Sequence, residues 1–532
     1  MAAPSTSIYD TWSREELIAR LTELDLEKGR PRQRPPSPKR PNKAFDFATH
    51  PRRKIALKFC YSGWEYGGLA FQNMNTSLPT VEGVLFDALV KARLIDPAGG
   101  FEGCGWEKCG RTDRGVSAAG QVISLWVRSA LGPKTGGQTD GMGAAASERS
   151  ISPSHATPDA KSTPIEATST STSTAADGLP GLEIGFEEED LEAPRTNSSL
   201  SIPSTTPKPR YEHDYLAILN RLLPPTIRII AWSPVSDCFS ARFSCAYRHY
   251  KYFFSSNTST GHALNIDRMR TAASLLIGEH DFRNLCKLDP GKQITMFKRK
   301  VMHAEIEPLS VDSAGKGMYV FNLIGSAFLY HQVRHIMAVL FMVGRGQEEP
   351  QVVTSLMNVE EGLEPGATEV VDSKPEYQMA DALPLMLWDC GYPEELVDWR
   401  TTNGYPVADG GDTRTDLYQQ LHAIHERSQV YTVLNEHFLA AASRFHLPPP
   451  TRDGLSRDEE VSSATPSGKV LIPLGGGTYK RTSQDKYTPL LRRNRLDPVE
   501  VINERWRVGK GFRREERRKA AEGAMEDSDG DE

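Results

Sequence analysis

The chain has 532 residues, with hydrophobic residues at 38% and a mean hydropathy of -0.46, so only part of it is expected to fold. Its formal net charge of -6 argues at first against a nucleic-acid partner, but much of the acidity lies in two runs, at 183–192 and 522–532. Without those runs the remainder is net basic, which is compatible with RNA binding. The sequence has neither a signal-peptide-type start nor a long apolar run, and a soluble protein is expected.

The first 50 residues form an N-terminal helix and a basic, Pro-rich arm. Leu17, Ile18, Leu21 and Leu24 have helical spacing within 13–27. The stretch GRPRQRPPSPKRPNK at 29–43 is read as a solvated linker, with an RNA-touching or nuclear-import tail as the alternative.

A first folded half is expected at 51–131. KIALKFCY alternates apolar residues and predicts a strand, and VEGVLFDALVKARL predicts an amphipathic helix with Thr80 as its N-cap. The loop GRTDRG and the strand GQVISLWV follow. This order of elements indicates an α+β, α/β-like fold.

Residues 132–209 are rich in Ser and Thr and contain the acidic run at 183–192, so they are predicted to be a disordered insertion. A second folded half is expected at 210–395. It contains a helix near 211–223, strands at 227–232, 248–254 and 318–324, and a long helix ending at Gly344 or Gly346. Residues 396–532 are a C-terminal extension with one further helical pattern at 417–445, a basic run and an acidic tail.

Four residues are candidates for chemistry. Asp113 lies between Arg111 and Arg114 in the Gly-flanked loop, and it fits either an ordinary turn or a catalytic carboxylate held by guanidinium groups. Arg334 lies in or beside an apolar helical stripe, where it either snorkels to solvent or pairs with a carboxylate. Tyr250 is either a core aromatic or a stacking face for a nucleobase.

Metal binding is not expected. The seven cysteines are odd in number and scattered, which indicates reduced thiols in an intracellular protein, and Cys104 and Cys109 lack a second ligand pair. His331 and His335 are not accompanied by an H-E-x-x-H pattern, so packing histidines are expected there.

Four ordered motifs resemble the TruA-type tRNA pseudouridine synthases. GRTDRGVSA resembles the active-site motif of that family. The other three are FSARFSCAYRHYKYFF (Phe239–Phe254), GSAFLYHQVRHIMAVLFMVGRG (Gly325–Gly346) and ALPLMLWDCGYP (Ala382–Pro393). YSGWEYGGLAFQ, EHDFRNLCKLDP and LWDCGYP look most like the eukaryotic tRNA pseudouridine(38/39) synthase branch.

The resemblance implies two similar halves, with mixed antiparallel sheets and flanking helices around a central RNA-binding cleft. It implies isomerisation of uridine to pseudouridine in the anticodon stem-loop of tRNA, at positions 38/39, without a cofactor. Asp113 would act as nucleophile or base at the sugar, with Arg334 as its partner, Arg111 helping to hold the flipped nucleotide and Tyr250 stacking on the uracil. A homodimer in cytoplasm and nucleus, with no membrane association, is implied as well. The alternatives are the same chemistry at other tRNA positions and a non-catalytic RNA-binding protein of the same fold.

Overall fold

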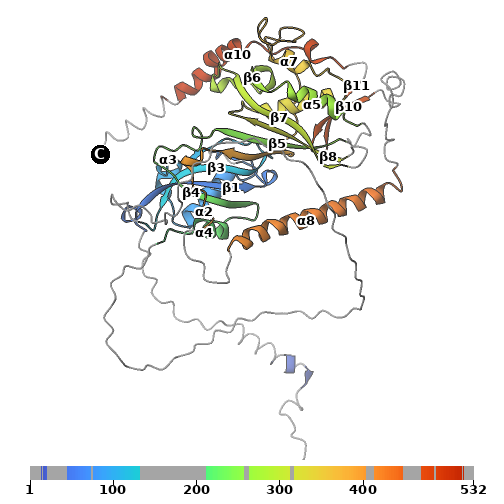
Figure 1. The fold of residues 1–532 in the computed structure, drawn as a ribbon. Coiled ribbons are helices and arrows are strands. Elements are labelled where there is room, and N and C mark those ends of the chain that lie inside the picture. The colour runs from blue at the N-terminus through green and yellow to red at the C-terminus, as the bar shows by residue number, and fades with distance from the viewer. Residues whose placement is uncertain are drawn as a thin grey trace, which may run out of the picture. The chain divides into compact units, whose positions relative to one another are not determined.

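The computed structural model covers the two expected folded halves and parts of the C-terminal extension (Figure 1). The residues it describes are parts of 13–20, and 45–72, 76–131, 211–256, 263–311, 317–402, 413–446, 469–483, 487–517 and 519. The predicted insertion at 132–209 lies outside the described residues, as do the basic arm at 29–43 and the acidic tail. Most of the predicted helix at 13–27 also lies outside them.

Within the described part of the chain, nine strands form one large mixed sheet. Its order is β4-β1-β3-β9-β5-β8-β7-β6, with β2 paired to β3, and all pairs are antiparallel except β3 and β9. The strands are β1 (Arg52–Tyr61), β2 (Glu107–Lys108), β3 (Ser117–Arg128), β4 (Ile227–Pro234), β5 (Tyr247–Ser255), β6 (Gly278–Asp281), β7 (Lys298–Val311), β8 (Gly317–Gly325) and β9 (Leu385–Gly391).

The sheet corrects one detail of the expected architecture. The two halves do not have separate sheets, because β9 pairs in parallel with β3 of the first half and antiparallel with β5 of the second. The parallel contact is short, with Ser117 opposite Met386 and Ala118 opposite Leu387. The α+β class and the two-half organisation stand, but both halves share one continuous sheet.

Each half has its own hydrophobic core. The first core lies between β1, β3 and β4 and the helices α2 (Val81–Lys91) and α4 (Tyr215–Leu222). The second lies between strands β5 to β8 and the helices α5 (Ile266–Ser274), α6 (Gln332–Gly344) and α7 (Val352–Met357). Tyr250 packs against both cores, so it lies where the two halves meet.

Capping and apolar composition account for two of these helices, α2 and α6. The Thr80 hydroxyl accepts a hydrogen bond from the Gly83 N–H at 3.3 Å, so Thr80 caps α2 as expected. Helix α6 is apolar around most of its circumference and is buried along almost its whole length. A rigid, buried helix is a firm support for the side chains at its N-terminal end.

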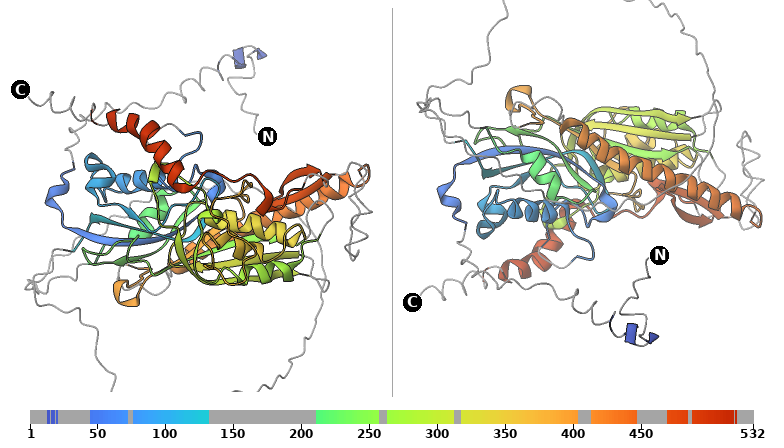
Figure 2. Two further views of the ribbon diagram at one scale, coloured as in Figure 1. Left: turned by 90° about the horizontal axis from the view of Figure 1, so that it is seen from above. Right: turned by 90° about the horizontal axis from the view of Figure 1, so that it is seen from below.

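The C-terminal extension contributes to the second core (Figures 1 and 2). Ile472 of the hairpin β10 (Lys469–Gly475) and β11 (Thr478–Ser483), Leu490 and Val499 of α10 (Val499–Trp506) are all buried there. The Tyr252 hydroxyl donates to the Leu474 carbonyl at 3.1 Å. These contacts join residues beyond 469 to the strand that carries Tyr250.

Helix α8 (Thr413–Ala442) is exposed along nearly its whole length. Near its start, the Gln420 side chain accepts a hydrogen bond from Arg228 Nε at 2.8 Å. Of the helices described, none is long and apolar enough to cross a lipid bilayer.

Candidate active site

The loop that carries Asp113 is fixed from both sides. The Thr112 hydroxyl shares a hydrogen bond with the Tyr61 hydroxyl at 2.6 Å, and the Thr112 carbonyl accepts the Leu69 N–H at 3.2 Å. The Asp113 carbonyl accepts the Val116 N–H at 3.1 Å, which closes a turn through Gly115. Gly115 has a φ of 85°, a backbone conformation that favours glycine. The backbone of the loop is therefore held while the Asp113 side chain stays 24% exposed.

An imidazole and a guanidinium from the second half contact the Asp113 carboxylate. Oδ2 lies 3.2 Å from His331 Nε2 and 3.5 Å from Arg334 Nη1. Arg334 Nε donates to the Ala380 carbonyl at 2.8 Å, which fixes the direction of the guanidinium. His331 and Arg334 are only 7% and 13% exposed, so both contacts are shielded from water more than the carboxylate itself. The structure thus brings together Asp113 and Arg334, two residues singled out from the sequence.

His331 is a site residue that the sequence reasoning missed. We expected both His331 and His335 to be packing histidines, and only His335 is one. His331 adopts a left-handed backbone, with a φ of 58°, at the N-cap of α6, and this turns its ring toward Asp113. Its Nδ1 is buried and has no hydrogen-bond partner among the described residues. The spacing of His331 and Arg334, three residues apart on one helix, was the available signal that they share a face.

His335 lies behind the site and is buried. Its ring contacts Lys374 Nζ at 3.1 Å through Nε2. Burial, followed by the charge of Lys374, lowers the pKa of His335 to about 2. Burial also lowers the pKa of Lys374 to about 8. His335 is therefore a neutral packing residue at physiological pH.

Tyr250 on β5 lies beside the same carboxylate. Its ring packs edge-to-face on Phe328, with 5.1 Å between ring centroids. Burial raises the pKa of Tyr250, and the neighbouring Cys390, Cys109 and Asp113 groups raise it further. The phenol is therefore neutral, and its ring is part of the wall between the two cores.

Arg111 lies on the exposed side of the loop. Its side chain forms no hydrogen bond or ion pair with any residue in the described ranges. Its charge acts on Tyr330, as do those of Asp113 and Arg334. Arg111 is thus close to the other candidates but is not bonded to them.

A basic and aromatic surface adjoins the carboxylate. Tyr330 is 37% exposed and its ring lies against that of His331, with 3.8 Å between centroids. Lys292 Nζ lies 4.5 Å and Lys287 Nζ 5.6 Å from the centroid of the Tyr330 ring. A flat ring between two ammonium groups is a suitable surface for a base and its phosphates.

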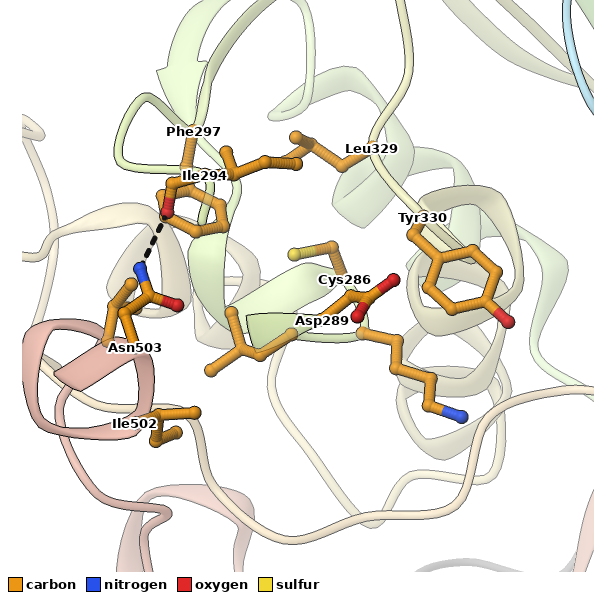
Figure 3. Close-up of a pocket in the computed structure, with 11 residues that line it drawn as sticks. Cys286, Asp289, Ile294, Phe297, Leu329, Tyr330, Ile502 and Asn503 are labelled. Atoms are coloured by element: carbon orange, nitrogen blue, oxygen red, sulfur yellow. Dashed lines mark hydrogen bonds between the residues drawn. The ribbon is translucent and has the colours of Figure 1, made fainter. Parts of the chain in front are cut away.

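Tyr330 also lines a pocket that the C-terminal helix completes (Figure 3). The loop before β7 contributes Ile294 and Phe297, and Ile502 and Asn503 of α10 lie on the same side of the pocket, across from Tyr330. Asn503 Nδ2 donates to the Ile294 carbonyl at 3.1 Å and joins these two segments. The sequence alone did not indicate that the C-terminal extension comes so close to the candidate site.

Comparison with known proteins decides the family. The family described as tRNA pseudouridine synthase matches residues 272–393. The tRNA pseudouridine(38/39) synthase of Saccharomyces cerevisiae is 34% identical over 94% of this chain and 92% of its own length. The chain belongs to the tRNA pseudouridine synthase family.

Other members of the pseudouridine synthase family match over shorter stretches. The human tRNA pseudouridine(38/39) synthase is 35% identical over 72% of this chain and 67% of its own length. A tRNA pseudouridine synthase A from Methanosarcina mazei is 26% identical over 66% of this chain and 88% of its own length. The family predicted from the four motifs is therefore confirmed.

As a pseudouridine synthase, the chain divides its site between two parts of the sequence. His331 and Arg334 lie within the matched residues 272–393, whereas Asp113 and Tyr250 lie outside them. The shared sheet and the contact of both cores with Tyr250 bring the two parts together.

Proposed function

We propose that this protein isomerises uridine to pseudouridine in the anticodon stem-loop of tRNA, at positions 38 and 39. The observation that carries the proposal is the partly exposed carboxylate of Asp113, held by His331 and Arg334 where the two halves meet. Family membership gives the reaction class, and the similarity to the 38/39 enzymes supports the target positions.

The reaction needs one ionised carboxylate and no redox partner. The N1–C1′ bond of the nucleoside breaks, the uracil turns, and C5 bonds to C1′ while C5 loses a proton and N1 gains one. Asp113 would either attack C1′ or remove a proton from the sugar, and both routes require its charged form. A cation beside a carboxylate stabilises that form, which gives Arg334 its proposed role. A hydrogen bond donated by the His331 ring would act in the same direction.

The target uridine has to leave the helix stack before C1′ is accessible. The ring of Tyr250 would then stack on the uracil. Arg111, which has no side-chain bond to any described residue, would hold the flipped nucleotide through its phosphate. Lys287, Lys292 and Tyr330 extend the same surface and would contact the neighbouring backbone.

We further propose a homodimer that works in cytoplasm and nucleus. Helix α8 supports the dimer, because apolar side chains recur along it at coiled-coil spacing while remaining exposed or half-exposed. The positions concerned are Leu417, Leu421, Ile424, Tyr431 and Phe438. The proposed compartments follow from the family resemblance alone.

The deciding experiment is pseudouridine mapping on unmodified tRNA transcripts incubated with wild type and Asp113→Ala. Product at position 38 or 39 that is lost in the variant supports the proposal. Product at other positions would support the proposed reaction but overturn the assignment of positions 38 and 39. Tight tRNA binding without product from the wild type favours the non-catalytic RNA-binding alternative.

A further inference from the structure

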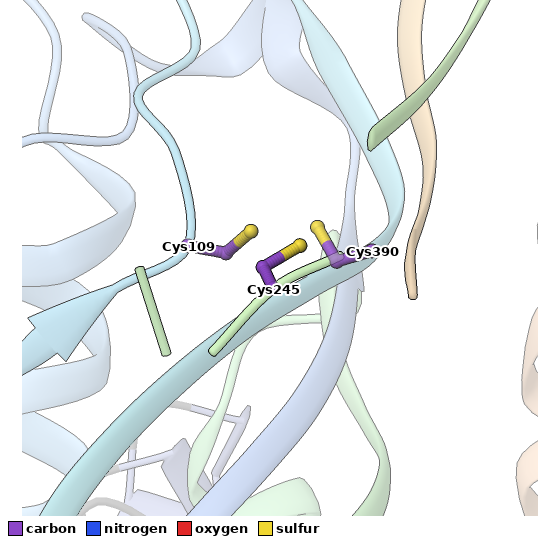
Figure 4. Close-up of side chains that lie close together, drawn as sticks. All are labelled: Cys109, Cys245 and Cys390. Carbon is purple, nitrogen blue, oxygen red and sulfur yellow. The ribbon is translucent and has the colours of Figure 1, made fainter. Parts of the chain in front are cut away.

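Three buried cysteines from three separate segments meet behind the loop of Asp113 (Figure 4). Cys109 lies between β2 and that loop, Cys245 directly precedes β5, and Cys390 lies in β9. They are 2%, 8% and 2% exposed, and none forms a disulfide. Their Sγ atoms all lie within 4.8 Å of one another. The three segments are far apart in the sequence, and only the folded chain brings the cysteines together. The sequence alone therefore did not indicate the cluster.

The spacing suits a shared metal ion. Zn²⁺–thiolate bonds are about 2.3 Å long, so sulfur atoms on one tetrahedral ion lie about 3.8 Å apart. Small side-chain rotations would bring the three sulfur atoms of the cluster to that separation. Three protein ligands leave one position of the ion for a water molecule.

A guanidinium, that of Arg248, lies beside the cluster. Arg248 donates to the carbonyl oxygens of Cys109, Arg242 and Ser326 at 3.2, 2.7 and 2.6 Å. Within the described residues it has no carboxylate at ion-pair distance, and its charge interacts with all three thiols. The cluster therefore lies next to a partly buried cation that could balance negative charge there.

We propose that Cys109, Cys245 and Cys390 bind a thiophilic divalent cation of the Zn²⁺ class. Each thiol gives up its proton on binding, and three thiolates with one divalent ion carry one net negative charge. Arg248 balances that charge, whereas a monovalent ion would leave an excess of negative charge in a buried place. The ion would fasten the start of the Asp113 loop to β9 and to the beginning of β5, the strand that carries Tyr250.

The test is the metal content of the purified full-length protein. Wild type, Cys245→Ser and Cys104→Ser are produced in zinc-supplemented medium, purified under reducing conditions and dialysed before elemental analysis. Cys104 is the matched control, because it is also buried but lies outside the cluster and donates to the Phe101 carbonyl. We expect near-equimolar zinc in wild type and Cys104→Ser, and loss of most of it in Cys245→Ser.

A second measurement uses only the wild type, in case the variant does not fold. Chelator-treated protein is titrated with Co²⁺, and thiolate-to-cobalt charge-transfer absorption is expected to saturate near one equivalent. Metal-free wild type that shows no such absorption overturns the proposal. Equal zinc in Cys245→Ser and wild type also overturns it. Both measurements are independent of pseudouridine formation, so the proposed function could fail while this site stands.

Discussion

The imidazole of His331 lies 3.2 Å from the carboxylate of Asp113, although the two residues belong to different halves of the protein. Arg334 approaches the same oxygen from one helical turn further along α6. Both contacts are to Oδ2 of Asp113, and neither involves Oδ1. The arrangement therefore orients Asp113 and leaves one oxygen for the substrate.

Replacing Asp113 with Ala or Asn is expected to abolish pseudouridine formation. Neither replacement supplies a charged oxygen, and we expect a loss of at least about a thousandfold in kcat. Dissociation constants for tRNA should change only several-fold, because phosphate contacts dominate affinity. Single-turnover assays and filter binding measure the two quantities. Substantial residual activity in either variant would show that another group performs the chemistry.

His331→Gln is expected to lower kcat by about tenfold to a hundredfold, the usual cost of losing a hydrogen bond to a charged group. The KM for tRNA should change little, since the His331 ring is buried beneath the exposed surface. His303→Gln is the control, as that side chain is 43% exposed and pairs with Glu305. A kcat equal to wild type in His331→Gln would mean that the contact with Asp113 only supports packing.

Arg334→Lys is expected to be nearly as harmful as Arg334→Gln. Lysine keeps the charge but cannot reach the Ala380 carbonyl and Asp113 with two fixed donors, as the guanidinium does. We expect kcat to fall by about tenfold or more in both variants. If Arg334→Lys were fully active, the charge alone would explain the role of Arg334 and the orientation argument would be wrong.

Tyr250→Phe and Tyr250→Ala separate stacking from hydroxyl chemistry. The ring packs on Phe328 and the phenol is neutral, so Tyr250→Phe should preserve uracil stacking and most of the binding energy. Tyr250→Ala should cost about 1–3 kcal/mol of stacking per base, seen as a raised KM or a lowered kcat/KM. Equal defects in both variants would assign the essential function to the hydroxyl.

Burial of His335 makes the free energy of unfolding decrease at acid pH. Its pKa is about 2 in the folded protein, below the unfolded value near 6.5. The full contribution of His335 to the free energy of unfolding is present above the pKa of the unfolded state. As pH falls below that pKa, His335 takes up a proton only in the unfolded state, so the contribution is lost. At pH 5 the loss is about 2 kcal/mol. Urea unfolding of wild type and His335→Gln between pH 8 and 5 should show a shallower decline in the variant, and parallel curves would contradict this assignment.

Much of the local structure follows from the sequence, because it is encoded by neighbouring residues. Apolar alternation predicts β1, and Thr80 with the apolar positions after it predicts α2. The long strand β7 was not predicted, because KRKVMHAEIEPLSV lacks a sustained alternation. Its place is set by pairing with β8 along almost its whole length. Tertiary pairing, rather than propensity, decides such a strand.

The candidate site likewise has some residues that the local sequence predicts and others that it does not. Asp113, Tyr250 and Arg334 stood out because their motifs are local. The role of His331 depends on a left-handed backbone conformation that only the packed end of α6 imposes, and no periodicity encodes it. The meeting of Cys109 with Cys245 and Cys390 depends on strand order, which local patterns do not specify.

The position of β9 has a consequence for synthesis of the chain. This strand completes the sheet between β3 and β5, yet it is made long after both. Until residues 385–391 emerge from the ribosome, a nascent chain therefore lacks the strand that joins β3 to β5. A chain that ends earlier would expose two unpaired strand edges, those of β3 and β5, to chaperones and to aggregation.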